Sequence, residues 1–174
     1  GYFSDGFDLP YIKARADKYH INLDLGSDNS LVSFKRGLGE STARIKGILH
    51  LDILKFIKKI MAGSLQLDSY SLNVVAQELL HEKKKDINID NIMTAWDDVK
   101  DLEKYCEYNL QDVELTLKIF DKIFPNMAEL VKLIGISMFD ICRMSYGQLV
   151  ENYLFKKAKE FNEIIPSKPS HTNI

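Results

Sequence analysis

The sequence has few cysteines and no long apolar run. Its 174 residues include two cysteines, Cys106 and Cys142, which lie far apart and show no CxxC spacing. This argues against a disulfide scaffold or a zinc knuckle and favours a reducing compartment, which we take to be the cytoplasm. No stretch of about 18 apolar residues occurs, so we expect no membrane span. No signal peptide is evident, and the chain lacks an initiator methionine, so we expect a piece of a longer protein.

The overall charge is also small. The net charge is −2, and nothing in the whole-chain composition indicates a nucleic-acid partner. Hydrophobic residues make up 45% and charged residues 28%, as in a soluble globular domain. The charge is uneven, however, because residues 31–60 carry a net charge of +5. Such a patch is either a solvated lysine face or a surface for backbone phosphates.

Two further patterns are missing. The sequence contains no internal repeat, and "GLGEST" is not a dinucleotide-binding fingerprint, because it has no third glycine and does not open a helix. The alternating residues on either side of "RGLGES" instead predict a β-hairpin over about 31–51.

The remaining pattern is mostly helical. Apolar spacing and breaker residues predict helices over 9–19, 53–61, 71–80, 91–99, 101–124, 126–138 and 145–161. Gly63 is expected to end the second of these helices and Pro125 the fifth. The charged stretch "HEKKKDINID" is predicted to be a connector. We expect one domain over 1–165, followed by a polar, proline-containing linker over 166–174.

The helix predicted over 101–124 carries two stripes. The first was assigned to the core and contains Leu102, Cys106, Leu110, Val113, Leu117 and Phe120. The second contains Tyr105, Tyr108, Asp112, Leu115 and Ile119. In the second stripe Tyr108 and Asp112 lie one turn apart on the same face. Asp112 either reaches water past the tyrosine or binds a cation, because an acid beside apolar residues needs compensation.

A second aspartate occurs near the start of the chain. Asp8 ends the stretch "SDGFD" and precedes Pro10, which falls near the first position of the predicted helix. Asp8 is therefore either the N-cap of this helix or a ligand.

Taken together, the two aspartate motifs resemble a known family. "SDGFD" resembles the second exonuclease motif of the family B DNA polymerases, and "YNLQD" resembles the third. Five further stretches, in order, look like the archaeal branch of that family. They are "GILHLDILKFI", "YSLNVVAQELL", "IMTAWDD", "GQLVENYLFKKA" and "NEIIPSKP".

The resemblance implies an α/β, ribonuclease H-like 3′–5′ exonuclease fold, present here as a mostly helical part with one β-hairpin. It also implies proofreading of the 3′ end of DNA with two Mg²⁺ or Mn²⁺ ions held by four carboxylates. Asp8 would hold one ion and Asp112 the other, while Tyr108 would orient the attacking water or the scissile phosphate. Phe7 either packs against an unstacked terminal base or belongs to the core.

The resemblance assigns the basic patch to the same substrate. Four hairpin cations would contact primer–template DNA: Lys35, Arg36, Arg44 and Lys46. The other expected partner is the remainder of a polymerase chain. We expect Asp8 and Asp112 to approach each other, because the helix beginning at Leu9 should pack on the long helix.

The sequence departs from the family pattern in two respects. Phe3 stands where the family usually has an asparagine, and the first motif, an Asp-x-Glu, is expected upstream of Gly1. We therefore expect the isolated chain to be inactive as a nuclease, with Asp5 and Asp52 unable to replace the first motif. A catalytically inactive, polymerase-like DNA-binding module is the alternative, and a purely structural helical domain is a third possibility.

Overall fold

The computed structural model describes residues 1–36, 40–82 and 99–166 of the chain. The predicted linker over 166–174 and the predicted helix over 91–99 fall almost entirely outside these residues. Most of the charged connector also lies outside them. In chain order the elements are α1 (Asp8–Lys18), β1 (Ser33–Arg36), β2 (Ser41–Arg44), α2 (Ile53–Phe56), η1 (Ile57–Met61), α3 (Ala62–Leu65), α4 (Leu72–Leu80), α6 (Val99–Ile134), α7 (Met138–Ile141) and α8 (Tyr146–Glu160).

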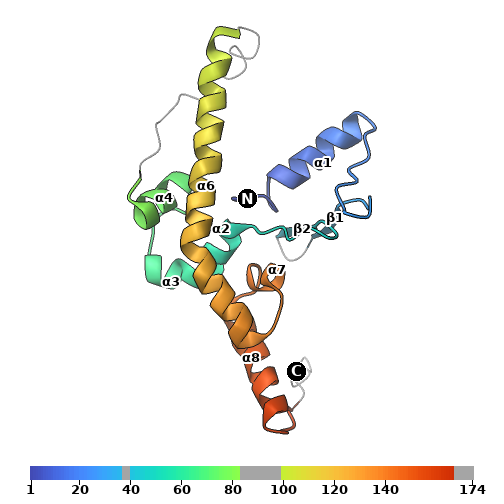
Figure 1. Ribbon diagram of the computed structural model, residues 1–174, viewed down its shortest axis with the longest axis vertical. Helices are drawn as coiled ribbons and strands as arrows, with labels where there is room; N and C mark the ends of the chain where they lie inside the picture. The colour runs from blue at the N-terminus through green and yellow to red at the C-terminus, as the bar shows by residue number, and fades with distance from the viewer. Residues whose placement is uncertain (37–39, 83–98, 167–174) are drawn as a thin grey trace, which may run out of the picture.

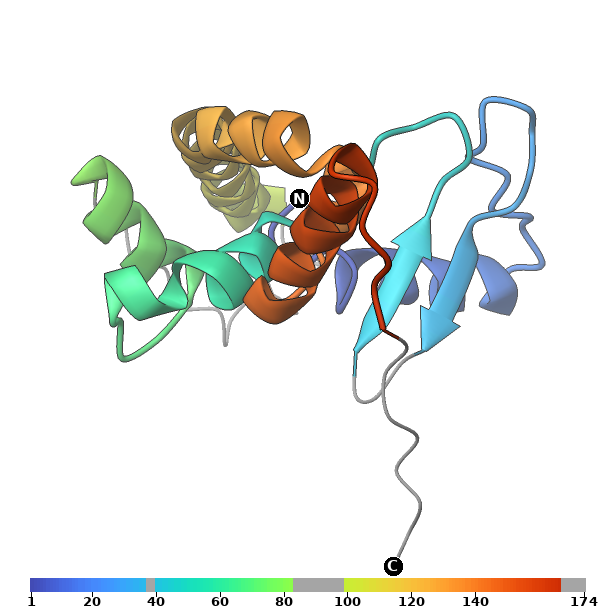
Figure 2. The same ribbon diagram turned by 90° about the horizontal axis from the view of Figure 1, so that it is seen from below.

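The long helix α6 runs through the length of the molecule (Figure 1). On one side of it lie α3 and α4, and on the other lie α1 and the hairpin (Figures 1 and 2). The main core forms where α2, η1 and α4 meet α6, α7 and α8, and it contains Phe56, Ile57, Val75, Ile119 and Ile141. A second, smaller cluster joins α1 to the hairpin through Leu9, Val32, Ala43 and Ile45. Helix α1 thus packs on the hairpin rather than along α6, unlike our expectation.

The second strand of the hairpin, β2, ends earlier than the predicted hairpin, which extends to about residue 51. β1 pairs antiparallel with β2, with Ser33 opposite Arg44 and Phe34 opposite Ala43. β2 ends at Arg44 because the chain turns at Gly47, whose positive φ of 78° suits glycine. Part of the predicted turn, residues 37–39, lies outside the described residues.

The predicted helix over 53–61 continues farther. α2, the π-helical segment η1 and α3 follow one another without a break to Leu65. Gly63 therefore lies inside the helical run and does not end it. The end comes at Gln66, which adopts the left-handed conformation with φ 48°.

Pro125 does not end the long helix. It lies inside α6, which continues to Ile134 and includes most of the helix predicted separately over 126–138. Proline removes one backbone hydrogen bond and crowds the preceding turn. Ile123 and Met127 flank it and are almost completely buried, so packing on both sides of the proline outweighs this local cost.

The choice between the two stripes of α6 was wrong. Leu115 and Ile119, from the stripe with Asp112, are buried, whereas Leu110, Val113 and Leu117 are more than half exposed. Both stripes have helical spacing, so periodicity could not rank them. The ranking follows from the tertiary contact with α4, which packs against α6.

Serine caps fix the start of two other helices. The Ser71 hydroxyl accepts a hydrogen bond from the backbone N–H of Val74 at the start of α4. Ser145 and Gln148 form a reciprocal capping box at the start of α8. Among the described residues, no helix combines the length and the apolarity that crossing a membrane requires.

We predict that Pro125→Ala raises the free energy of unfolding by about 1–3 kcal/mol, because alanine restores the missing N–H and is the better helix former. Urea denaturation of the chain measures this change. Lys122→Ala, an exposed change in the same helix, should stay within about 0.5 kcal/mol of wild type. A loss of stability in Pro125→Ala would show that α6 needs its proline.

Candidate active site

Asp8 opens α1 and does not cap it. The N-cap residue is Phe7, and no side chain makes a capping hydrogen bond there. The capping alternative for Asp8 is therefore wrong. The helix instead starts from a tight backbone loop, in which the amides of Gly6 and Phe7 donate to the carbonyl oxygen of Phe3 at 3.1 and 2.9 Å.

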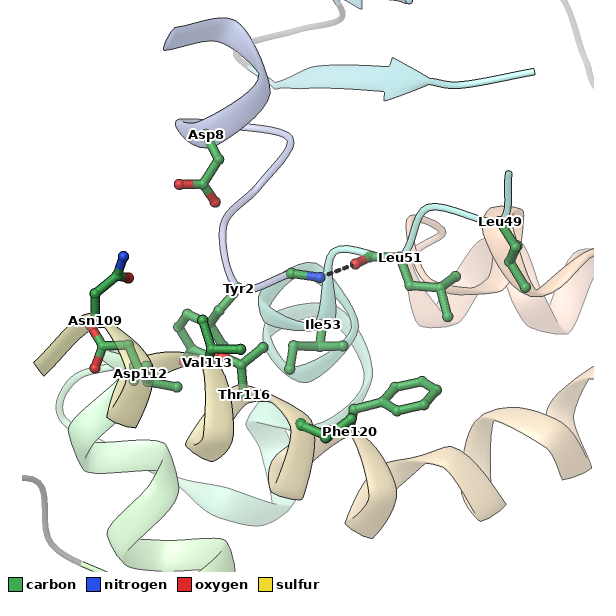
Figure 3. A pocket seen from close by; sticks show the side chains of 13 residues that line it. Tyr2, Asp8, Leu49, Leu51, Ile53, Asn109, Asp112, Val113, Thr116 and Phe120 are labelled. Atoms are coloured by element: carbon green, nitrogen blue, oxygen red, sulfur yellow. Dashed lines mark hydrogen bonds between the residues drawn. The ribbon is translucent and has the colours of Figure 1, made fainter. Parts of the chain in front are cut away.

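The carboxylate of Asp8 faces a cavity of about 780 Å³ that Asp112 also lines. Figure 3 shows Asp8 directed from the first turn of α1 toward the wall of α6 that carries Asn109 and Asp112. Two acids that are far apart in the sequence thus line the same cavity. The rest of the lining is mostly apolar and comes from Gly1, Tyr2, Leu49, Leu51, Ile53, Leu72, Val113, Thr116, Leu117 and Phe120.

The apolar wall explains the exposed stripe of α6. Val113 and Leu117, assigned to the core from the sequence, line this cavity instead. Apolar walls reduce the local dielectric, so charges inside the cavity interact more strongly than they would in bulk water. The first stripe of α6, exposed to solvent rather than packed in the core, therefore helps to form the candidate site.

Tyr108 does not belong to the cavity wall. It is half-buried on α6, one turn before Asp112, and the side chain that lines the cavity from that turn is Asn109. Asn109 and Thr116 were not predicted as site residues, although their spacings of three and four residues from Asp112 place them on the same face.

The pKa of Asp8 is raised above its ordinary value. Partial burial is the main cause and outweighs the lowering effect of the amino terminus, while the charge of Asp52 raises the pKa further. Burial thus disfavours the ionised form of Asp8, and a cation bound beside the carboxylate would stabilise that form. This is the electrostatic setting in which a carboxylate gains from binding a cation.

Asp52 holds the loop that leads to Asp8. Asp52 is completely buried, and its two carboxylate oxygens accept hydrogen bonds from the backbone amides of Phe3 and Asp5, each at 3.0 Å. Phe3 takes a positive φ of 62° in this loop and leaves its ring half exposed. The direction in which the chain enters α1 therefore depends on Asp52.

Asp5 ties this loop to two other parts of the molecule. Its buried carboxylate accepts from Arg143 Nε at 2.8 Å, from Lys55 Nζ at 2.9 Å and from the backbone amide of Ala43 at 2.9 Å. Burial by itself raises the pKa of Asp5, but these three donors outweigh it and hold the pKa below its ordinary value. Asp5 thus lies in the turn before α1, as expected, and is an ionised, buried residue that joins several segments.

Two neighbours complete this cluster. His50 lies 3.5 Å from the Asp5 carboxylate through Nδ1, and burial lowers its pKa. The Cys142 thiol donates to the carbonyl oxygen of Asp52 at 2.9 Å, and burial raises its pKa to about 11. The sequence signal was an acid and a histidine within the apolar run "ILHLDIL", since buried polar groups need partners.

The hairpin cations are only partly available to an outside partner. Arg44 lies 3.6 Å from the Asp140 carboxylate and over the Phe139 ring, and Lys46 pairs with Asp28. Lys35 is exposed, and the side chain of Arg36 lies outside the described set. Lys55, counted in the basic stretch, is instead buried against Asp5.

Phe7 is not a core residue. Its ring is 59% exposed and stacks on Tyr11, with centroids 5.8 Å apart and an interplanar angle of 12°. This leaves contact with a partner as the remaining alternative for Phe7. Within the described ranges, no group of three or more His, Cys, Asp or Glu residues is arranged to hold a metal ion.

Comparison with known proteins relates this chain to one family. Residues 1–75 match the model for the exonuclease domain of DNA polymerase family B. The chain is 37% identical over 169 residues to DNA polymerase 1 of Pyrococcus abyssi and 33% identical over 173 residues to the DNA polymerase of Thermococcus kodakarensis. These matches cover 97% and 99% of the chain but only 21% and 10% of the relatives.

A solved structure supports the same relation at the level of the fold. The family B DNA polymerase from the hyperthermophilic archaeon Pyrobaculum calidifontis superposes with a TM-score of 0.81 at 22% identity. The superposition covers 98% of this chain and 22% of the polymerase. The predicted ribonuclease H-like exonuclease fold, present as a mostly helical part with one hairpin, is confirmed.

The Asp5 cluster predicts an acid-labile fold. The pKa of Asp5 is lower in the folded state than in the unfolded state, so its stabilising effect is complete above the unfolded value. That effect is lost as the pH falls below about 4, through the folded value. Asp5→Asn removes this titration and leaves Arg143 and Lys55 without their carboxylate. The variant should lose about 3–5 kcal/mol at neutral pH.

Urea denaturation between about pH 6 and about pH 3 measures both effects. Asp17→Asn is the matched control, because Asp17 forms an exposed pair with Lys13. Its stability should stay within about 1 kcal/mol of wild type. Equal stability of Asp5→Asn and wild type at neutral pH would contradict the role assigned to Asp5.

Proposed function

Since the chain belongs to the exonuclease domain of the family B DNA polymerases, we propose that it forms part of the 3′–5′ proofreading site of such a polymerase. The reaction is hydrolysis of the terminal phosphodiester at a single-stranded 3′ end, and the protein acts in the cytoplasm. The observation that carries this proposal is the cavity that Asp8 and Asp112 line together. The chain spans about a fifth of its Pyrococcus relative, so the remainder of a polymerase is the partner we propose.

The donor atoms in the cavity suit hard divalent cations. Asp8 and Asp112 present carboxylate oxygens, which Mg²⁺ and Mn²⁺ prefer, and a bound cation would offset the burial that raises the pKa of Asp8. Asp8 would hold one ion and Asp112 the other. Such ions, when bound, supply charge neutralisation at the phosphate and lower the pKa of coordinated water.

The other residues have positioning roles in this proposal. The Tyr108 hydroxyl, one turn from Asp112, would orient the attacking water or the scissile phosphate from behind the cavity wall. The Asn109 amide, in the wall itself, would donate to a phosphate oxygen. The apolar wall on α6 would limit water around the reacting phosphate.

The hairpin would contact the DNA backbone. Lys35 is exposed for this role, and Arg36 follows it on β1. Arg44 and Lys46 would exchange Asp140 and Asp28 for phosphates. Because these are exchanges of one anion for another, their gain in affinity is smaller than for an unpaired cation.

We predict that Asp112→Ala in the complete polymerase removes 3′–5′ digestion and leaves polymerisation near its wild-type rate. Loss of a direct ligand should exceed the roughly 10- to 100-fold effect of losing an outer-shell partner. Tyr108→Phe, which loses only a hydroxyl, should reduce digestion less. The measurement is trimming of a labelled mismatched primer beside nucleotide incorporation.

Asp121→Ala is the matched control, because it makes the same change at an exposed position of α6 away from the cavity. It should trim at the wild-type rate. Wild-type trimming by Asp112→Ala would refute the assignment. A wild-type polymerase that binds the primer but does not trim it would favour the alternative function, an inactive DNA-binding module.

The 174-residue chain alone should not digest DNA. Among the described residues, its cavity offers the carboxylates of two acids, Asp8 and Asp112, while Asp5 and Asp52 are committed to buried hydrogen bonds. Two neighbouring dications repel each other strongly, and two carboxylates offset this repulsion poorly. We expect no digestion of a labelled single-stranded oligonucleotide, even in millimolar Mn²⁺. Digestion that is present in this chain and absent in its Asp112→Ala variant would disprove this expectation.

A further inference from the structure

One face of α1 carries exposed aromatic and basic side chains at regular spacing. Phe7, Tyr11, Arg15 and Tyr19 follow one another every four residues, and Lys18 lies beside them. The three rings are 59%, 56% and 56% exposed. We refer to these five residues as the α1 aromatic face.

The α1 aromatic face is the solvent side of the helix. Leu9 and Ala16, on the opposite side, are buried, and Leu9 packs in the cluster that joins α1 to the hairpin. The helix begins beside the cavity at Asp8 and extends away from α6 (Figure 1). Phe7, at one end of the face, directly precedes Asp8, which lines the cavity of the candidate active site.

The groups on this face contact one another. Phe7 stacks on Tyr11 at one end. At the other end Arg15 lies 5.1 Å from the centroid of the Tyr19 ring and donates to its hydroxyl at 3.1 Å, and Lys18 lies 5.9 Å from the same centroid. These contacts hold flat rings and positive charges together at the surface.

The charges of the face are not neutralised by the helix itself. Lys13 pairs with Asp17 on another side of α1. Arg15 and Lys18 form no ion pair with any residue in the described part of the chain. Protein–protein interfaces are depleted in lysine at their centres, whereas single-stranded nucleic acid binds to combinations of stacked rings and cations.

We propose that the α1 aromatic face is a binding track for single-stranded DNA that leads the 3′ end to the Asp8 cavity. Bases stack on Phe7, Tyr11 and Tyr19, and backbone phosphates approach Arg15 and Lys18. The face is about 18 Å long at about 1.5 Å per helical residue, which matches about five stacked nucleotides. The direction of the strand rests on the proposed nuclease function, but binding to the face does not.

The test measures affinity alone. Fluorescence anisotropy of a 5′-labelled oligodeoxythymidylate is recorded with this chain in EDTA, so that no metal-dependent digestion can occur. Tyr11→Ala should weaken binding about 5- to 150-fold, the range for loss of one stacked base, while Tyr11→Phe should bind like wild type. Arg15→Ala should reduce the slope of log affinity against log salt by about 0.7.

Matched controls separate this face from general effects. Tyr146→Ala removes a tyrosine that is 67% exposed on α8, and Lys13→Ala removes a cation from another side of α1. Both should keep the wild-type affinity. Circular dichroism identifies variants that lose their fold, and Tyr11→Leu, which keeps a bulky apolar side chain but no ring, should reproduce the loss of affinity.

Two results overturn the proposal. The first is a folded Tyr11→Ala chain that binds the oligonucleotide as tightly as wild type; if that variant also self-associates less, the face makes a protein contact instead. The second is a wild-type chain that shows no binding. The two proposals can also fail separately. If Tyr11→Ala weakens binding of the oligonucleotide but the complete wild-type polymerase does not trim primers, the nuclease proposal is refuted and the proposed binding track is supported.

Discussion

The geometry of the candidate site depends on one buried carboxylate. Asp5 accepts from Arg143, Lys55 and the backbone of Ala43, so a single side chain joins the segment after α7, helix α2 and strand β2. Desolvation of an ionised acid is costly, and each donor offsets part of that cost. Because the cost is recovered only when all three segments are in place, their relative positions are coupled. Asp5 precedes Asp8 by one turn of loop, so the coupling reaches the site directly.

Asp52 complements Asp5 by acting on the backbone. Its carboxylate binds the amides of Phe3 and Asp5, and its carbonyl oxygen accepts from the buried Cys142 thiol. Asp52 directly precedes α2, which belongs to the main core with α6. The loop that carries Asp8 is thus connected to α6 through α2, although α1 itself packs on the hairpin. This indirect connection brings Asp8 and Asp112 to the same cavity.

The sequence predicted local features well and failed where tertiary contacts decide. The hairpin and the helices over about 71–80 and 145–161 follow from local patterns, and both helices are closed by local serine caps. The extent of α6 did not, because packing on both sides of Pro125 outweighs a local penalty. Periodicity identified both stripes of α6 but could not show which one is buried.

In the candidate site, too, the features that depend on tertiary contacts could not be predicted from local sequence patterns. The pairing of Asp8 with Asp112 came from a resemblance, because no local pattern relates residues so distant in sequence. The buried hub at Asp5 was missed since its partners Lys55 and Arg143 are also distant, and a charge count treats Lys55 like any surface lysine. Fixed residues thus surround Asp8 on the interior side, and exposed rings adjoin it on the solvent side. The backbone before Asp8 is fixed by buried hydrogen bonds, while the Asp8 carboxylate faces the cavity. In the proposed site, the carboxylate would therefore contact the 3′ end of a DNA strand without rearrangement of the fold, which is the preorganisation that catalysis by positioning requires.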